Sequence, residues 1–155
     1  MFELDGEVAL VTGGGGLIGE AICAALVEQG GRVVIAEADE GRGTAAADRL
    51  GPEAAFHRAD VTDERSVSRL VDAVVDEYGR LDVLVNSAYP RNEAYGRPYE
   101  EVTYEDWCEN VVDHLGGYYL TSRVAGSVMA DQESGGSIVN LGSIYGVRGP
   151  DLPIY

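Results

Sequence analysis

A glycine-rich segment near the start of the sequence has the residue types and spacing to hold phosphate groups. Thr12 is followed by four glycines, two apolar residues and a fifth glycine. Small residues let a backbone pass close to a pyrophosphate, and a helix start supplies free N–H groups with a partial positive charge. A tight turn would contain similar glycines, but this segment lies between an apolar run at 7–12 and a helical pattern at 17–29. We therefore predict a nucleotide-binding loop made by Gly13, Gly16, Leu17, Ile18 and Gly19.

An acidic residue ends the next apolar run of the sequence. Glu37 follows 32–36, and a carboxylate at this place can accept hydrogen bonds from both hydroxyls of an adenosine ribose. The same carboxylate would repel the 2′-phosphate of NADP, and because Ala38 follows rather than an arginine, no cation is offered to that phosphate. We therefore predict NAD rather than NADP as the cofactor. Asp39 is the competing acid, and we expect it to cap the following helix.

Short apolar runs alternate with helical patterns along the chain, and this alternation predicts the elements that position these residues. It is typical of α/β proteins, in which a parallel sheet carries helices on both faces. The expected fold is a doubly wound parallel sheet of the Rossmann type, in one domain over 1–155. Gly116 and Gly117 predict close packing or a kink within the last helix. The expected strands are 7–12, 32–36, 54–59, 81–85 and 137–141, and the expected helices are 17–29, 40–50, 63–78 and 103–129.

The charge of the chain limits its partners. Asp and Glu number 27 against 11 basic residues, all of them arginine, so the net charge is −16 and lysine-dependent chemistry is excluded within this chain. Such a charge repels phosphate backbones and anionic membranes, and no apolar run is long enough to span a bilayer. We therefore expect no nucleic-acid partner, no membrane and a cytoplasmic location. An acidic surface would also suit a halophile, although a GC-rich coding bias would remove lysine equally well.

The two cysteines of the chain do not form a disulfide framework. We expect both Cys23 and Cys108 to be buried, because free cysteine behaves as a small apolar residue. No metal site is predicted.

Further motifs follow the later strands. Asp60-Val61 follows the third expected strand, Asn86-Ser87-Ala88 the fourth, and Asn140-Leu141-Gly142-Ser143 the fifth. Together with the glycine loop and Glu37, these segments resemble the short-chain dehydrogenase/reductase family over nearly the whole chain. The resemblance implies a homo-oligomer, dimer or tetramer, as the full-length form. It also implies that Asp60 and Val61 hold the adenine ring and that Asn86, Ser87 and Ala88 belong to the cofactor site.

Some positions depart from the compact members of that family. Ser87 and Tyr89 differ from its Asn-Asn-Ala-Gly motif, and Leu17 stands where the compact members have a second loop glycine. The resulting TGxxGxxG spacing is that of the sugar-nucleotide epimerase branch. Seven residues after Trp107, His114 stands where the family has an asparagine that bends its helix and holds a proton-relay water. The sequence leaves two roles open for His114, proton transfer and packing beside the cofactor pocket.

The resemblance also implies a reaction, the reversible transfer of hydride between a nicotinamide and a carbinol carbon. Ser143 would orient the substrate oxygen, and a later tyrosine beside a lysine, in a Tyr-x-x-x-Lys motif, would act as acid and base. Tyr155 stands twelve residues after Ser143 and is the last residue of the chain. It is one candidate for the acid and base, and a tyrosine beyond it is the other, because 150–155 also resembles a stretch that precedes an insertion. We expect the chain to be a fragment of a longer enzyme.

Three segments resemble one subgroup of the family, related to flagellin modification protein A. They are 86–92, 114–122 and 142–147. The subgroup is implicated in sugar metabolism for surface glycans, which implies a small polar substrate, a sugar or another polyol. Two alternatives stay open, an NAD-binding fragment or pseudoenzyme without turnover and a sugar-nucleotide epimerase or dehydratase. We expect the substrate pocket to be lined by Tyr89, Arg91, Asn92 and Tyr145.

Overall fold

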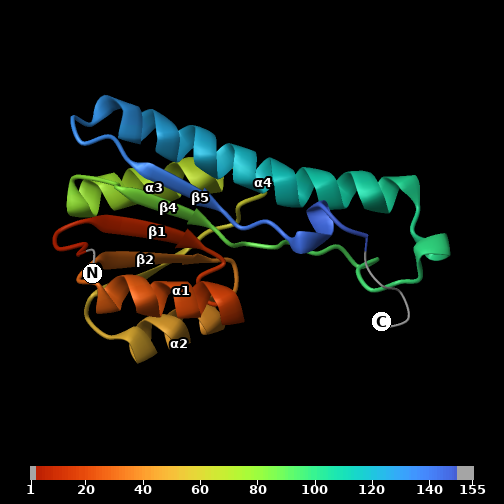
Figure 1. Cartoon of the computed structure of the whole chain (residues 1–155), viewed down its shortest axis with the longest axis horizontal. Helices are drawn as coiled ribbons and strands as arrows, with labels where there is room; N and C mark the ends of the chain where they lie inside the picture. The colour runs from red at the N-terminus through yellow and green to blue at the C-terminus, as the bar shows by residue number, and fades with distance from the viewer. Residues whose placement is uncertain (1–2, 150–155) are drawn as a thin grey trace.

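Five strands form one parallel sheet in the order β3-β2-β1-β4-β5 (Figure 1). The computed structural model describes residues 3–149, so Tyr155 lies outside the described residues. The strands are β1 (Val8–Thr12), β2 (Arg32–Glu37), β3 (Ala54–Arg58), β4 (Val83–Asn86) and β5 (Ser137–Asn140). The helices are α1 (Leu17–Glu28), α2 (Glu40–Leu50), α3 (Glu64–Tyr78) and α4 (Tyr104–Asp131), with 3-10 helices at Tyr99–Glu101 and Ile144–Gly146. The predicted α/β fold is confirmed, and each predicted bound lies within two residues of the observed one.

Helices cover both faces of the sheet. The pair α1 and α2 packs on one face and the pair α3 and α4 on the other (Figure 1). Along β1, Val8 and Leu10 point into the α3/α4 side of the core, whereas Ala9 and Val11 point into the α1/α2 side. Both sets are almost completely buried. A strand buried on both faces needs apolar residues at every position, which is why the sequence shows a continuous run here rather than an alternation.

The strand order determines where a ligand can enter. From β1 the chain runs through β2 to β3 on one side and then returns to place β4 and β5 on the other side. The loops that leave β1 and β4 therefore separate at the carboxyl edge of the sheet, and open α/β sheets bind ligands at such a point. β5 lies at the edge of the sheet, and all four of its residues are exposed.

Side chains cap three of the four long helices at their N-termini. Asp39 accepts a hydrogen bond from the backbone N–H of Arg42, as the sequence predicts, and Asp63 accepts one from that of Arg65. Thr103 and Asp106 form a capping box at the start of α4. These caps set where each helix begins.

Gly117, the second residue of the glycine pair in α4, serves close packing. α4 runs through both glycines without interruption, and a Cβ added to Gly117 would lie 3.0 Å from Cγ2 of Val61, in the loop after β3. Cys23 is buried as expected, but the same expectation for Cys108 is wrong because its side chain is only half-buried at the start of α4. No helix within residues 3–149 is long and apolar enough to cross a membrane.

Candidate functional site

A cleft of about 1020 Å³ lies along the carboxyl edge of the sheet, and we call it the carboxyl-edge cleft. Segments that follow every strand contribute to it. The end lined by the segments after β2 and β3 is called the β2/β3 end, and the end lined by the segments after β4 and β5 is called the β4/β5 end. Among the residues predicted to bind the cofactor or to act in catalysis, Asn86 is the one in the described range that does not line the cleft. The predicted site residues that do line it are Gly13, Gly16, Leu17, Ile18, Gly19, Glu37, Asp60, Val61, Ser87, Ala88, His114 and Ser143.

The glycine loop brings the start of α1 to the middle of the cleft. α1 is the long helix that has no side-chain cap, so the N–H groups of its first residues remain available to an anion. A Cβ added to Gly19 would lie 2.1 Å from the carbonyl oxygen of Gly13, so only glycine permits this close turn. Gly13 alone among the loop glycines has a positive φ, of 66°, and helical geometry already begins at Leu17. A side chain is therefore tolerated at Leu17, where the compact members of the resembled family have glycine.

Thr12 joins the glycine loop to the loop after β4. Its buried Oγ1 accepts hydrogen bonds from the backbone N–H groups of Ser87 and Ala88, at 3.2 and 3.3 Å. A Cβ added to Gly13 would lie 2.7 Å from Cα of Ala88. The two loops are thus held against each other at the point where the strand order reverses.

Glu37 ends β2 with its carboxylate in the cleft, although only 7% of the residue is exposed. Its Oε1 accepts hydrogen bonds from the backbone N–H groups of Ala38 and Asp39, at 3.1 and 3.2 Å, and from Nη2 of Arg42 at 3.0 Å. Arg42 also lines the cleft. The sequence predicts no cation from the position after Glu37, but the structure brings a cation to this carboxylate from the first turn of α2.

The loop after β3 completes the β2/β3 end. Oδ1 of Asp60 accepts hydrogen bonds from the backbone N–H and the hydroxyl of Thr62, at 2.9 and 2.7 Å. The Asp60 backbone N–H donates to Oγ of Ser66 at 2.9 Å. Val61 is 7% exposed and lines the cleft with an apolar surface. A fixed carboxylate therefore lies beside an apolar wall, and the roles predicted for Asp60 and Val61 toward an adenine ring stay predictions.

Asn86 lies beneath the cleft and is completely buried. Its Nδ2 donates hydrogen bonds to Oδ1 of Asn140 at 2.8 Å and to Oγ of Ser122 at 3.0 Å. Its Oδ1 accepts from the hydroxyl of Thr121 at 2.7 Å. Asn86 therefore ties β4 to β5 and to α4 and supports the floor of the site, and Ser87 and Ala88 form the wall above it.

Aromatic rings occupy the β4/β5 end of the cleft. The His114 ring packs edge-on between the rings of Tyr89, at a centroid distance of 4.5 Å, and Tyr118, at 4.9 Å. Burial lowers the pKa of His114, so its imidazole is neutral at neutral pH. This geometry agrees with the packing role that the sequence left open for His114. The Tyr118 hydroxyl donates to the carbonyl of Leu141, which links the cluster to the segment of Ser143.

Ser143 lies at the β4/β5 end, where it starts the 3-10 helix Ile144–Gly146. Its Oγ accepts a hydrogen bond from the backbone N–H of Tyr145 at 3.2 Å, so the hydroxyl hydrogen can be donated to a ligand. Tyr145 also lines the cleft, as expected.

Asn92 does not line the cleft, so that prediction is wrong. Its side-chain amide donates to the backbone carbonyl of Asp106 at 2.9 Å and to Oε2 of Glu109 at 3.1 Å. It thereby fastens the irregular segment after β4 to the start of α4. An amide that replaces missing backbone hydrogen bonds in an irregular loop cannot be recognised from the sequence, because its partners lie on another element.

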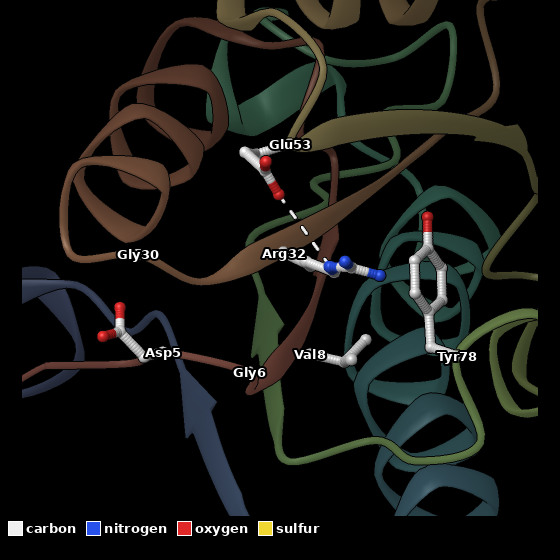
Figure 2. A pocket seen from close by; sticks show the side chains of 7 residues that line it. All are labelled: Asp5, Gly6, Val8, Gly30, Arg32, Glu53 and Tyr78. Atoms are coloured by element: carbon white, nitrogen blue, oxygen red, sulfur yellow. Dashed lines mark ion pairs between the residues drawn. The ribbon is translucent and has the colours of Figure 1, made fainter.

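A second cleft, of about 450 Å³, lies at the opposite edge of the sheet, and we call it the amino-edge cleft (Figure 2). Nε of Arg32 lies 3.9 Å from Oε2 of Glu53, and the Tyr78 ring stands on the other side of the arginine (Figure 2). Burial is the main cause that raises the pKa of Tyr78, to about 12. Asp5 lies across the cleft from these side chains. No residue that the sequence predicts for the site lines this cleft.

A model of the short chain dehydrogenase family matches residues 7–155. The chain belongs to this family. Among its relatives, D-threitol dehydrogenase of Mycolicibacterium smegmatis is 39% identical over 92% of the chain, and post-translational flagellin modification protein A of Campylobacter coli is 32% identical over 98%. A crystal structure of NAD+-bound xylitol dehydrogenase matches 95% of this chain with a TM-score of 0.85 at 31% identity. The chain spans 54%, 61% and 56% of the lengths of these three proteins, respectively.

Proposed function

We propose that the protein is an NAD-dependent oxidoreductase that interconverts a secondary alcohol and a ketone, with a sugar or another polyol as substrate. The observation that carries the proposal is that one cleft holds Glu37 at one end, the uncapped start of α1 in the middle and Ser143 at the other end. Relatives named for threitol, sorbitol and galactitol support the substrate class.

The residues of the cleft fit a dinucleotide. The free N–H groups at the start of α1 suit a pyrophosphate, and the Glu37 carboxylate suits the two hydroxyls of the adenosine ribose. Asp60 and Val61 would border the adenine ring, and Ser87 and Ala88 would border the middle of the cofactor.

The chemistry divides between cofactor and protein. When bound, NAD supplies the acceptor for the hydride that leaves the carbinol carbon. Ser143 would donate a hydrogen bond to the substrate oxygen, which orients the carbinol and stabilises charge on that oxygen. The hydroxyl proton must pass to a base, for which Tyr155 and a tyrosine beyond it are the two candidates. Loss of one hydride and one proton from the carbinol leaves the ketone.

We propose NAD over NADP on electrostatic grounds. A 2′-phosphate would meet the buried carboxylate of Glu37, and Arg42 is already engaged by that carboxylate. To bind the 2′-phosphate of NADP, Arg42 would have to break its hydrogen bond to Glu37. The largely buried Glu37 carboxylate would then lose one of its donors, which is costly.

The test is NADH formation by the whole protein with threitol, sorbitol, galactitol and xylitol. We expect reduction of NAD, weaker reduction of NADP, and loss of turnover in Ser143→Ala with cofactor binding retained. Tightly retained NAD without net turnover would instead favour an epimerase or dehydratase. Binding of NAD without any turnover would favour the pseudoenzyme. The absence of lysine in this chain supports that alternative.

We further propose that the whole protein is a cytoplasmic homo-oligomer. Val112, Leu115 and Tyr119 are 66%, 66% and 64% exposed, and their spacing places them along one stripe of α4. A stripe of this kind suits an interface. Light scattering should show an oligomer that Leu115→Glu weakens, and a monomeric wild-type protein would contradict this proposal.

A further inference from the structure

The charged groups that line the carboxyl-edge cleft are divided between its ends. Glu37, Asp60 and Arg42 lie at the β2/β3 end, where the arginine is paired with the glutamate. Of residues 3–149, the lining at the β4/β5 end contains one guanidinium, that of Arg91, and no carboxylate. Arg91 is therefore the one charged side chain that the described lining offers near Ser143, in a chain whose net charge is −16.

Aromatic rings hold the Arg91 guanidinium in place. Its Cζ lies 4.4 Å from the ring centroid of Tyr95 and 5.4 Å from that of Tyr89. These rings pack edge to face at 5.8 Å, and Tyr89 packs in turn on His114 of α4. Cation–π contacts of this kind restrict an arginine without using its N–H groups as ion-pair donors. Less conformational entropy is then lost when those donors bind a ligand.

Arg91 forms no ion pair with any carboxylate of residues 3–149, although acids surround it in the sequence. Glu93 stands two residues away, and Arg97 of the same irregular segment pairs with Asp106 at 3.8 Å. The nearby imidazole of His114 is neutral, so it neither adds to this charge nor cancels it. A planar guanidinium with free donors matches a carboxylate or a phosphate, each of which can accept two parallel hydrogen bonds.

We propose that the substrate is a polyhydroxylated compound with an acidic group, a carboxylate or a phosphate ester, which Arg91 binds while the reacting carbinol lies at Ser143. This inference rests on the proposed function and specifies its substrate class. It also departs from what the relatives suggest, because threitol, sorbitol and galactitol carry no charge.

The test measures ternary binding, so that it does not depend on turnover. The full chain is first titrated with NADH, and the complex is then titrated with sorbitol, gluconate and sorbitol 6-phosphate while NADH fluorescence is recorded. We expect one of the two anions to bind roughly 10- to 100-fold more tightly than sorbitol, as for other charge-assisted hydrogen bonds. The two anions distinguish the carboxylate from the phosphate.

Variants link the preference to one side chain. Arg91→Gln should remove most of the anion preference, and Arg91→Lys should restore part of it. Arg69→Gln is the matched control, because Arg69 is an exposed residue of α3 that makes no ion pair with residues 3–149. This substitution changes the net charge by the same amount and should leave the anion preference intact.

Two outcomes overturn the inference in distinguishable ways. If NADH binds but sorbitol binds as well as both anions, or if Arg91→Gln keeps the anion preference, the substrate class is wrong and the cofactor site stands. If NADH itself does not bind, the proposed function fails together with the inference.

Discussion

The sheet carries a cleft at each edge, and the two clefts face opposite ends of the helices. Segments after the strands line the carboxyl-edge cleft, which therefore receives helix N-termini such as that of α1. Segments before the strands line the amino-edge cleft, where α1 ends at Glu28, two residues before Gly30, and α3 ends at Tyr78. N-termini present N–H groups and partial positive charge, whereas C-termini present carbonyls and partial negative charge.

This difference explains why a parallel sheet offers only one edge to an anionic cofactor. At the carboxyl edge, α1 has no side-chain cap and a glycine loop lets a ligand approach its N–H groups. At the amino edge, Arg32 is paired with the carboxylate of Glu53, so the pair offers no net positive charge to an anion. We therefore expect substitutions at the carboxyl edge to change cofactor binding and substitutions at the amino edge to change only stability.

The largest effect is expected for Gly19→Ala. The added methyl group would lie 2.1 Å from the Gly13 carbonyl oxygen, so the loop must move away from the start of α1. We expect NAD binding, measured by titration calorimetry, to weaken by about 100-fold, as for other displacements of about 1 Å in a site. Gly116→Ala is the matched control, because its nearest atom lies 4.0 Å away. Equal binding by Gly19→Ala and the wild type would refute the role of the loop.

The next effect is expected for Glu37→Gln. The neutral amide loses charge-assisted hydrogen bonds to a ribose and no longer repels a 2′-phosphate, so NAD affinity should fall by about tenfold or more. NADP affinity should rise, because Arg42 is released from its pair. Asp39→Asn is the control, since asparagine also caps a helix and this side chain does not line the cleft. An unchanged ratio of NAD to NADP affinity would contradict the assignment.

At the amino edge, Asp82→Asn should lower stability without affecting the cofactor. Asp82 is 6% exposed, and it accepts hydrogen bonds from the Val8 backbone N–H at 2.9 Å and from Arg80 at 2.6 and 2.7 Å. Weakening this buried network should cost about 1–2 kcal/mol in the free energy of unfolding, measured in urea. Asp72→Asn, at an exposed position of α3, should cost nothing measurable. A change in the NAD affinity of Asp82→Asn would contradict the expectation that substitutions at the amino edge change only stability.

Thiol labelling should distinguish Cys23, which is buried beneath the glycine loop, from Cys108, which is half-buried at the start of α4. Burial raises the pKa of Cys23 from 9.0 to about 12, so its thiol stays protonated and closed to reagents at neutral pH, whereas Cys108 should react. Because the folded state holds the proton more tightly, this group stabilises the fold fully below pH 9.0 and loses its contribution as pH rises toward 12. Mass spectrometry should show one label on the native chain and two in denaturant. Rapid labelling of native Cys23 would disagree with its burial.

The smallest effect is expected for Arg32→Ala. The Arg32–Glu53 pair spans 3.9 Å, and its two side chains are 59% and 54% exposed, so solvent screens most of the attraction. The free energy of unfolding should change by less than about 0.5 kcal/mol, and NAD affinity should not change. A weaker NAD complex would show that the amino edge takes part in cofactor binding.

Local patterns were sufficient to predict the fold and to place Glu37 at the end of a buried strand. The strand at Val8–Thr12 shows its burial as a continuous apolar run, and Glu37 is recognisable because it directly follows another such run. These signals lie within a few residues of the groups they position. Hydrophobic periodicity and helix caps are properties of the same kind, which is why each bound was predicted within two residues.

The β4/β5 end depends on contacts between distant segments, which local patterns do not contain. Asn92 is engaged by Asp106 and Glu109 of α4, and Tyr89 packs on His114 of the same helix. At the β2/β3 end, the contact of Arg42 could not be predicted from local patterns either. Its pairing with Glu37 depends on where the first turn of α2 points, although the Asp39 cap was a signal that this turn begins nearby.

Hydrogen–deuterium exchange of the chain with and without NAD tests the central claim most directly, because it compares both edges of the unmodified protein in one experiment. The account predicts that NAD slows exchange in segments 12–20, 36–43 and 86–89, and leaves segments 5–8, 30–33 and 52–54 unchanged. Protection at those amino-edge segments, or binding of NAD without protection at 12–20, would contradict it.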